Sequence, residues 1–284
     1  MNQLEGFATK NVLLRDYSNN TSLNRELYGF SVKQMDRLRF WCSVRNSDSM
    51  YQEISSPTTL AVANGDPVGT WKDVSPNRYL FNTASNSYRP TLVNNSLNGF
   101  PGLQHDGVDD YLTTASLLPG RVAPITVITV LKFNSFPAAS GWVWLQGQDR
   151  CADFLIYNNG SSTIWTYNGY LSVDIFQESP RTTAGGYFTV GSPAVVAVVY
   201  NRTSTFMRVN KTIGTFKLDH LPNMQYGYLG NPYNNNKFTI SGRGGPSQVS
   251  NTTFYEIMMY EKAASPSDLD YIFQYFGKIY GIAV

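Results

Sequence analysis

After residue 100 the chain contains short, mainly hydrophobic runs that are separated by polar and turn-forming residues, which is typical of β-strands. The runs are rich in β-branched or aromatic residues and are separated by glycine, proline and asparagine. They cover residues 125–131, 194–200, 205–209, 238–240 and 253–260. Asn210 and Lys211 follow the third run and predict a hairpin turn. Short strands with such punctuation predict an antiparallel sandwich, not an alternation of strands and helices.

The last segment of the chain has a different period, which predicts one helix. Ser265 is a helix N-cap, Pro266 suits the first helical position, and Asp268 is an acid three residues after the cap. Apolar residues then recur at helical spacing, at Leu269, Ile272, Phe273, Phe276 and Ile279. Gly281 can end the helix. Because the apolar residues form one stripe, we expect the helix to cover part of the sandwich.

Residues 1–37 are polar and rich in asparagine, and they show no strong hydrophobic period. Such a leader would be mobile unless another surface holds it. We therefore expect an N-terminal anchoring arm over residues 1–37 and a globular domain over residues 38–284. The arm docks either on a neighbouring subunit or on its own domain, and the sequence leaves both open.

Composition narrows the class of protein. Hydrophobic residues make up 42% of the chain, charged residues make up 15%, and the net charge is +2. This apolar content can build a sizeable core, and a nearly neutral chain carries no electrostatic footprint for nucleic acid. The longest clean apolar run, 194–200, is far shorter than the ~18 residues of a membrane span. The N-terminus lacks a secretory signal pattern, so we expect synthesis in a cytoplasm.

The two cysteines, Cys42 and Cys151, lie far apart and have no zinc-ligand spacing. Cys42 follows Phe40 and Trp41, which is an apolar context. The simplest interpretation is two free, buried thiols, and a disulfide between them is the alternative.

Three segments, in order, carry a resemblance to a known fold. Residues 68–77 (VGTWKDVSPN) are similar to a W-x-D-x-S-G-N turn, and residues 89–112 contain the runs RPTL, LNGFP and DGVDDYL. Residues 254–281 hold an E-I-x-x-Y strand, a helix and a Y-G ending. Together these segments resemble the concanavalin A-like lectin/glucanase superfamily, and specifically its laminin-G-like jelly-roll branch.

The resemblance covers about residues 38–284 and implies an all-β fold. That fold is a two-sheet antiparallel jelly-roll sandwich of concanavalin A-like type, with one C-terminal helix and an N-terminal extension. Three positions depart from the family pattern: Pro76 and Lys211 each replace a glycine, and His105 replaces a phenylalanine. These departures leave the fold intact but weaken the transfer of individual site residues, since function resides in sites built onto a fold.

Glycoside hydrolysis is the enzymatic chemistry that the resemblance suggests, and it needs two carboxylates across the scissile bond. Jelly-roll glucanases carry them on one strand as E-x-D-x-x-E, and no such segment occurs here. Glu256 and Glu261 are five residues apart, which places them on opposite faces of a regular strand. His105 and His220 are the only histidines, and no Gly-x-Ser-x-Gly nucleophile elbow is present. The sequence therefore predicts that the protein is not an enzyme.

Asp106, Asp109 and Asp110 lie close together in sequence and offer the oxygen ligands that calcium prefers. The alternative is a structural turn, in which Asp106-Gly107 makes the turn and Asp109 or Asp110 accepts backbone N–H bonds at the start of the next strand. We favour the turn and retain the three aspartates as candidate calcium ligands. The sequence requires no other cofactor.

Aromatic residues two apart predict a binding surface, because such residues share one face of a strand. Polar residues from adjoining loops add to it. The candidate ligand-binding residues are Trp144, Trp165, Tyr167, Tyr170, Tyr228, Asn231 and Tyr233. Aromatic faces combined with amide and hydroxyl groups bind sugars, and the same mixture suits a polar protein interface. The alternative is a tryptophan-rich sandwich core with tyrosines at its rims.

Low charge, a lectin-type sandwich and the absence of a catalytic constellation favour binding or architecture. Members of the superfamily that this sequence resembles occur as decoration, fibre and adsorption modules of virus and phage particles. We therefore expect a non-enzymatic, homo-oligomeric virion surface protein that binds other virion proteins through its arm. Attachment to cell-surface glycans would be a second role, with no nucleic-acid or membrane partner. The alternatives are a free carbohydrate-binding lectin, a glycoside hydrolase and an extracellular adhesion module.

Overall fold

In the computed structural model, Arg37–Val284 form the unit that contains the strands and the C-terminal helix. The residues that the structure describes are 37–114, 124–136, 140–148, 151–159, 164–168, 182–184, 188–200, 206–215, 237–242, 246 and 249–284. Except for Arg37, the predicted arm lies outside these residues, and its boundary with the domain stays a prediction.

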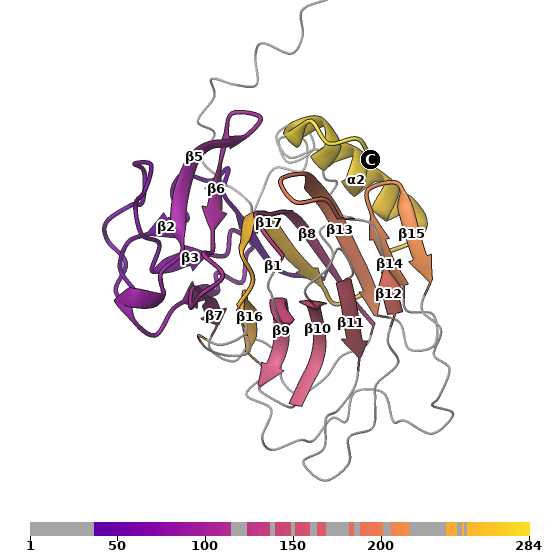
Figure 1. Ribbon diagram of the computed structural model, residues 1–284, viewed down its shortest axis with the longest axis horizontal. Helices are drawn as coiled ribbons and strands as arrows, with labels where there is room; N and C mark the ends of the chain where they lie inside the picture. Colours follow the sequence, from indigo (N-terminus) through magenta and orange to yellow (C-terminus); the bar gives the residue numbers. More distant parts are fainter. Residues whose placement is uncertain are drawn as a thin grey trace, which may run out of the picture. The chain divides into compact units, whose positions relative to one another are not determined.

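In the described part of the chain, eight strands form one antiparallel sheet, called sheet A (Figure 1). In spatial order, seven of them are β15 (Thr212–Thr215), β14 (Phe206–Val209), β13 (Pro193–Tyr200), β8 (Ile125–Phe133), β17 (Thr252–Tyr260), β6 (Phe100–Gln104) and β5 (Thr91–Leu97). The eighth strand, β1 (Leu38–Ser43), pairs with β17. A short 3-10 turn, η1 (Asn86–Tyr88), precedes β5.

Nine described strands form the second antiparallel sheet, sheet B. In spatial order they are β12 (Thr182–Ala184), β11 (Ile164–Asn168), β10 (Cys151–Asn159), β9 (Ser140–Gln148), β16 (Phe238–Ile240), β7 (Leu112–Thr114), β4 (Leu80–Asn82), β3 (Thr70–Lys72) and β2 (Met50–Tyr51). β2, β3, β4 and β7 span only two or three residues each. Such short strands carry no hydrophobic period that could be detected in the sequence.

The two sheets pack face to face through an aromatic core. Phe40 of β1 contacts Phe81 of β4 and Phe238 of β16, with ring centroids 5.1 and 4.8 Å apart. Both contacts are edge-on, a geometry that adds about 0.5–1.5 kcal/mol beyond the burial of the rings. All three side chains are fully buried. The described residues therefore form an antiparallel β-sandwich, which confirms the predicted architecture.

Helix α2 (Pro266–Tyr280) packs on sheet A beside β13 and β14 (Figure 1). Its N-terminus is the predicted one, because the Ser265 hydroxyl accepts the Asp268 N–H and the Asp268 carboxylate accepts the Ser265 N–H. Gly281 ends the helix with a left-handed φ of 67°. The guanidinium of Arg208 in β14 lies 4.2 Å from the ring centre of Phe273, which fixes the helix to the sheet.

Two sequence motifs meet at Trp41 of β1. The Trp41 backbone N–H donates to Asp73 at 2.8 Å, and the Trp41 indole N–H donates to Glu256 at 2.7 Å. Asp73 also accepts the backbone N–H groups of Ser75 and Tyr79. The W-x-D-x-S segment is therefore a structural turn that holds β1 in place.

The strands expected from the hydrophobic pattern are confirmed. The five runs fall on β8, β13, β14, β16 and β17. Asn210, with φ 49°, and Lys211 form the turn between β14 and β15. Five further strands, β1 to β5, lie before residue 100 in the described chain, where the sequence pattern alone showed none.

Three other expectations concern thiols, membrane spans and charge. Cys42 is a free thiol, and burial raises its pKa, so the disulfide alternative does not apply to it.

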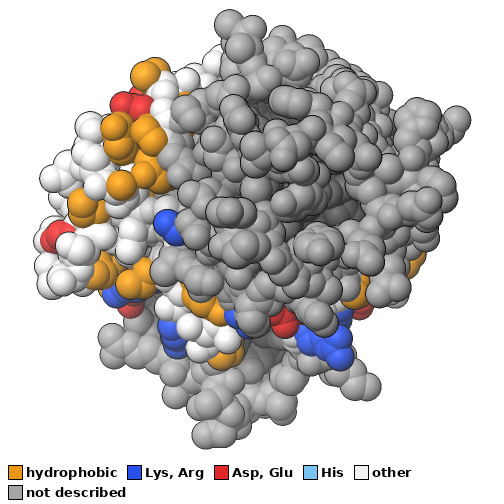
Figure 2. All heavy atoms as spheres, turned by 90° about the horizontal axis from the view of Figure 1, so that it is seen from below, with side chains coloured by type: hydrophobic (Ala, Val, Ile, Leu, Met, Phe, Trp, Pro, Cys, Tyr) orange, Lys and Arg blue, Asp and Glu red, His pale blue; other side chains and the backbone are white. Residues whose placement is uncertain are grey.

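Within the described residues, no helix has the length and apolar character of a membrane span. On the face shown in Figure 2, described acidic and basic side chains are interspersed, and hydrophobic side chains form small groups.

Candidate functional site

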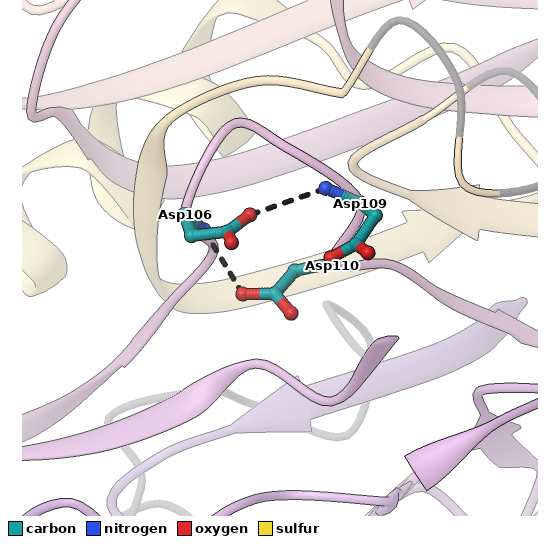
Figure 3. Close-up of side chains that lie close together, drawn as sticks. All are labelled: Asp106, Asp109 and Asp110. Atoms are coloured by element: carbon teal, nitrogen blue, oxygen red, sulfur yellow. Dashed lines mark hydrogen bonds between the residues drawn. The ribbon is translucent and has the colours of Figure 1, made fainter. Parts of the chain in front are cut away.

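The turn between β6 and β7 holds the three aspartates that are candidate calcium ligands (Figure 3). Gly107 takes φ 80° at its tip, a left-handed conformation that favours glycine. One carboxylate oxygen from each of Asp106, Asp109 and Asp110 lies within 4.8 Å of the others. The three carboxylates lie close enough to bind one ion together. The hydrogen bonds that they already accept show which of their oxygens the turn itself uses.

Backbone N–H groups of the turn already use two of the three carboxylates. Asp106 Oδ1 accepts the N–H groups of Val108 at 2.7 Å and of Asp109 at 3.3 Å. Asp110 Oδ2 accepts the Asp106 N–H at 3.0 Å (Figure 3). The Asp109 carboxylate accepts no hydrogen bond from the described residues. These contacts support the structural-turn alternative, with the Asp110 bond directed back to Asp106 and not to the start of β7, and the calcium ligation stays a prediction.

Burial controls protonation in and next to this turn. Burial, together with the charges of Asp106 and Asp109, raises the pKa of Asp110 to about 7. His105 is fully buried against Phe254, with ring centroids 5.2 Å apart. Burial lowers the pKa of His105 to about 3, and neither ring nitrogen makes a hydrogen bond of normal geometry among the described residues. His105 is thus a neutral core residue and not a catalytic base.

The predicted aromatic surface falls partly on neighbouring strands of sheet B. Trp144 lies in β9, and Trp165 and Tyr167 lie in β11, with β10 between the two strands. The other four candidates, Tyr170, Tyr228, Asn231 and Tyr233, lie outside the described residues. The structure therefore gives the strand register of three of the seven positions, and their role in binding stays a prediction.

Strand register separates these three positions into two groups. Trp144 stands opposite Ile156 of β10. Trp165 stands opposite Tyr157, in the adjacent row of the sheet, and Tyr167 lies two residues further along β11. Adjacent rows belong to opposite faces of a sheet, whereas positions two apart share a face. Positions 165 and 167 are therefore grouped, and position 144 is apart from them.

The row that contains position 144 belongs to the face of sheet B that packs against sheet A. Trp144 stands opposite Ile240 of β16, and Phe238, two residues earlier on that strand, packs against Phe40. Tyr157 is the position that joins Trp165 in the other row. Its pairing depends on the register between β10 and β11, so aromatic spacing within one strand could not reveal it.

Glu256 of β17, the acid considered for hydrolysis, is fully buried where β17 contacts β1 and α2. It accepts hydrogen bonds from the Ser43 hydroxyl at 3.0 Å, the Arg45 guanidinium at 2.6 Å and the Tyr280 hydroxyl at 2.7 Å. Burial and the negative charge of Glu256 raise the pKa of Tyr280 well above its ordinary value. No substrate can reach this carboxylate, so Glu256 has a structural role.

No family model matches the sequence, and no curated protein matches it either. Solved structures do share its fold. The Trypanosoma rangeli sialidase in complex with sialic acid is 14% identical over 84% of this chain, with a TM-score of 0.52. The binding domain of Paraclostridial Mosquitocidal Protein 1 is 10% identical over 86% of this chain, with a TM-score of 0.58. A mutant of HCR/D is 9% identical over 86% of this chain, with a TM-score of 0.56.

The likeness to sialidases corrects the prediction that the protein is not an enzyme, because enzymes are among the chains that share its fold. That prediction took a pair of carboxylates as the criterion for sugar hydrolysis. Sialidases use a tyrosine nucleophile, so the criterion does not apply to them. Tyr280 and Glu256 form a tyrosine–carboxylate contact, but both are buried.

This chain spans 33% of the sialidase chain and about half, 53% and 52%, of the two other chains. Sequence identities of 9 to 14% carry information on the fold and not on the ligand. The chain is therefore similar in fold to parts of sialidases and of binding domains, all of which contain a β-sandwich of this kind.

Proposed function

We propose that the protein is a carbohydrate-binding β-sandwich of the concanavalin A-like, laminin-G-like type. One observation supports the proposal: position 165 stands opposite position 157 in the register of β10 and β11, and position 167, two residues further along β11, shares a face with position 165. Aromatic groups gathered on one face of a sheet suit stacking against the C–H patches of a sugar ring. Asparagine and tyrosine residues that follow in the sequence supply hydrogen-bonding groups.

One protein of the same fold supports a sugar as the ligand class, and a second supports a role in binding. The Trypanosoma rangeli sialidase was solved with sialic acid, and the Paraclostridial structure is a binding domain. The net charge of +2 on this chain does not repel an acidic sugar. Sialylated glycans are therefore the first ligands to test.

A glycan array tests the proposal with three proteins: the wild type, Trp165→Ala and Tyr271→Ala. Tyr271 is a matched control, because it is a half-exposed aromatic residue on α2, which packs on the other sheet. We expect saturable wild-type binding that is lost in Trp165→Ala and retained in Tyr271→Ala. Folded wild-type protein that binds no glycan, or equal binding by Trp165→Ala, would contradict the proposal.

The same proteins, incubated with a fluorogenic sialoside, separate a binder from a hydrolase. Release of the fluorophore that depends on protein concentration would establish sugar cleavage. Binding on the array without release assigns the proposed role to adhesion. This second assay is needed because chains of the same fold include enzymes.

We further propose that glycan binding serves attachment at the surface of a virus particle. In this setting residues 38–284 form the exposed domain of a homo-oligomer, and the arm over residues 1–37 binds other virion proteins. The sequence resemblance is its support, and a free extracellular lectin is the alternative. Deleting residues 1–30 should leave the melting temperature unchanged and abolish incorporation into particles. A truncated chain that is still incorporated would contradict the anchoring arm.

A further inference from the structure

Two exposed Asn-Gly pairs within the described residues differ in how their backbone is held. Asn98-Gly99 forms the turn between β5 and β6, with φ angles of 48° and 83°. Asn64-Gly65 lies in the loop before β3. In such a pair the backbone nitrogen of glycine can attack the asparagine side-chain amide, because glycine has no side chain to hinder the approach. The two pairs share sequence and exposure, so only their contacts distinguish them.

The nitrogen of Gly99 is available, whereas the nitrogen of Gly65 is engaged. The Gly99 N–H makes no hydrogen bond among the described residues. The Gly65 N–H donates to the Leu92 carbonyl at 2.8 Å. Both asparagine side chains are held as well, because Asn64 Oδ1 accepts the Asn94 N–H at 2.9 Å and the Asn98 amide donates to the Ile279 carbonyl at 2.7 Å. The glycine nitrogens are therefore what distinguishes the two pairs. A nitrogen that donates a hydrogen bond loses its proton less readily, so the second pair is protected.

We infer that Asn98 is a site of spontaneous deamidation. The Gly99 nitrogen attacks Asn98 Cγ and gives its proton to water, and the side-chain nitrogen leaves as ammonia, which forms a succinimide. Water then opens the ring at either carbonyl and leaves aspartate or isoaspartate at position 98. Water is the only co-reactant, and neither oxidation nor reduction occurs.

The reaction changes a contact that holds helix α2. The Asn98 side-chain amide donates to the Ile279 carbonyl in the last turn of the helix at 2.7 Å. The product carboxylate cannot donate to this carbonyl, and it brings negative charge to the negative end of the helix dipole. Deamidation therefore breaks the link between the β5–β6 turn and α2, and it loosens the C-terminal end of the helix on sheet A.

Incubation of the full chain in mildly alkaline buffer, followed by peptide mass spectrometry, tests the inference. We expect the peptide with Asn98 to gain about 1 Da, with an isoaspartyl signal, several-fold faster than the peptide with Asn64. Asn98→Asp, which has the product's charge from the start, should melt at a lower temperature than the wild type. Asn98→Gln, which keeps an amide on a longer side chain, should stay unmodified at this position.

One result would overturn the inference of deamidation, and another would overturn its stated effect on helix α2. Equal modification of Asn64 and Asn98, or none at Asn98, would show that the free Gly99 nitrogen does not direct the reaction. A wild-type melting temperature for Asn98→Asp would show that the contact with Ile279 does not hold the helix. Asn98→Asp is a surface change, so its folding is not at issue.

Discussion

The indole N–H of Trp41 donates to the Glu256 carboxylate at 2.7 Å, across 215 residues of sequence. This single buried carboxylate joins β1, β17 and α2, because Tyr280 of the helix donates to it as well. Its charge partner is Arg45, whose Nε lies 2.6 Å away and whose guanidinium lies 5.6 Å from the ring centre of Tyr275. The contact therefore joins the E-I-x-x-Y strand to the closing helix.

Glu256→Gln should lower the free energy of unfolding by about 3 kcal/mol, because it leaves the Arg45 cation partly buried without its counter-charge. Glu261→Gln is the control, since Glu261 forms a partly exposed ion pair with Arg39 at 3.4 Å and should change stability by less than about 1 kcal/mol. Urea denaturation measures both variants. Equal losses in the two would show that the Glu256 network does not stabilise the fold.

Gly107→Ala should destabilise the protein more than Gly65→Ala. Both glycines have left-handed φ angles, 80° and 93°, so both variants incur roughly 1–2 kcal/mol of backbone strain. A Cβ on Gly107 would also lie 2.8 Å from Asn251 Cβ, whereas none of the surrounding atoms lies within 4 Å at Gly65. We expect a clearly lower melting temperature for Gly107→Ala by calorimetry. Similar melting temperatures would mean that Asn251 moves aside at little cost.

The long elements of the fold could be predicted from the sequence because each contains enough residues to show a period. β17 covers nine residues, and α2 covers fifteen with caps at both ends. β2, β3 and β4 contain two or three residues each, and their strand pairing depends on distant partners. Local pattern could not reveal these strands, and the motif resemblance supplied the missing half of the sandwich.

The candidate site was only partly predictable for a related reason. The spacing of Trp165 and Tyr167 placed them on one face, but the pairing with Tyr157 depends on the register between two strands. Sequence reasoning on the acidic residues was limited in the same way. Glu256 was weighed as a catalytic acid by its chemistry, and its burial among donors from β1 and α2 could not be seen from its neighbours in sequence.

His105→Phe should make the protein more stable in mild acid. Burial lowers the pKa of His105 to about 3, whereas its unfolded value is near 6.5. The unfolded chain therefore binds a proton that the folded state does not, and stability falls as pH drops from about 6.5 toward 3. At pH 5 this loss amounts to about 2 kcal/mol, which the phenylalanine variant should recover.

The effect of Asp110 on stability has the opposite pH dependence to that of His105. Stability must therefore be compared between wild type and variant at each pH, and not across the pH curve of one protein. Its pKa is raised to about 7 by burial and then by the neighbouring carboxylates, so its contribution is present at low pH and is lost as pH rises through about 7. Chemical unfolding of wild type and His105→Phe at pH 8 and pH 5 isolates His105. A stability difference between the two proteins that is the same at both pH values would show that His105 does not titrate as described.

Asp109→Asn distinguishes the structural turn from the calcium site. The Asp109 carboxylate accepts no hydrogen bond from the described residues, so the amide leaves the contacts of Asp106 and Asp110 in place. For a structural turn, millimolar Ca²⁺ should leave the melting temperature of both proteins unchanged, with Mg²⁺ as the control ion. A rise with Ca²⁺ in the wild type that disappears in Asp109→Asn would establish calcium binding instead.

Calorimetric titration of the glycan with the strongest array signal tests the proposed sugar-binding face most directly. We predict saturable binding to the wild type and to Tyr271→Ala, and affinity at least tenfold weaker for Trp165→Ala, a loss of about 1.4 kcal/mol or more. The far-ultraviolet spectra of the three proteins should agree. An unchanged dissociation constant for a folded Trp165→Ala protein would contradict the placement of the sugar on β11.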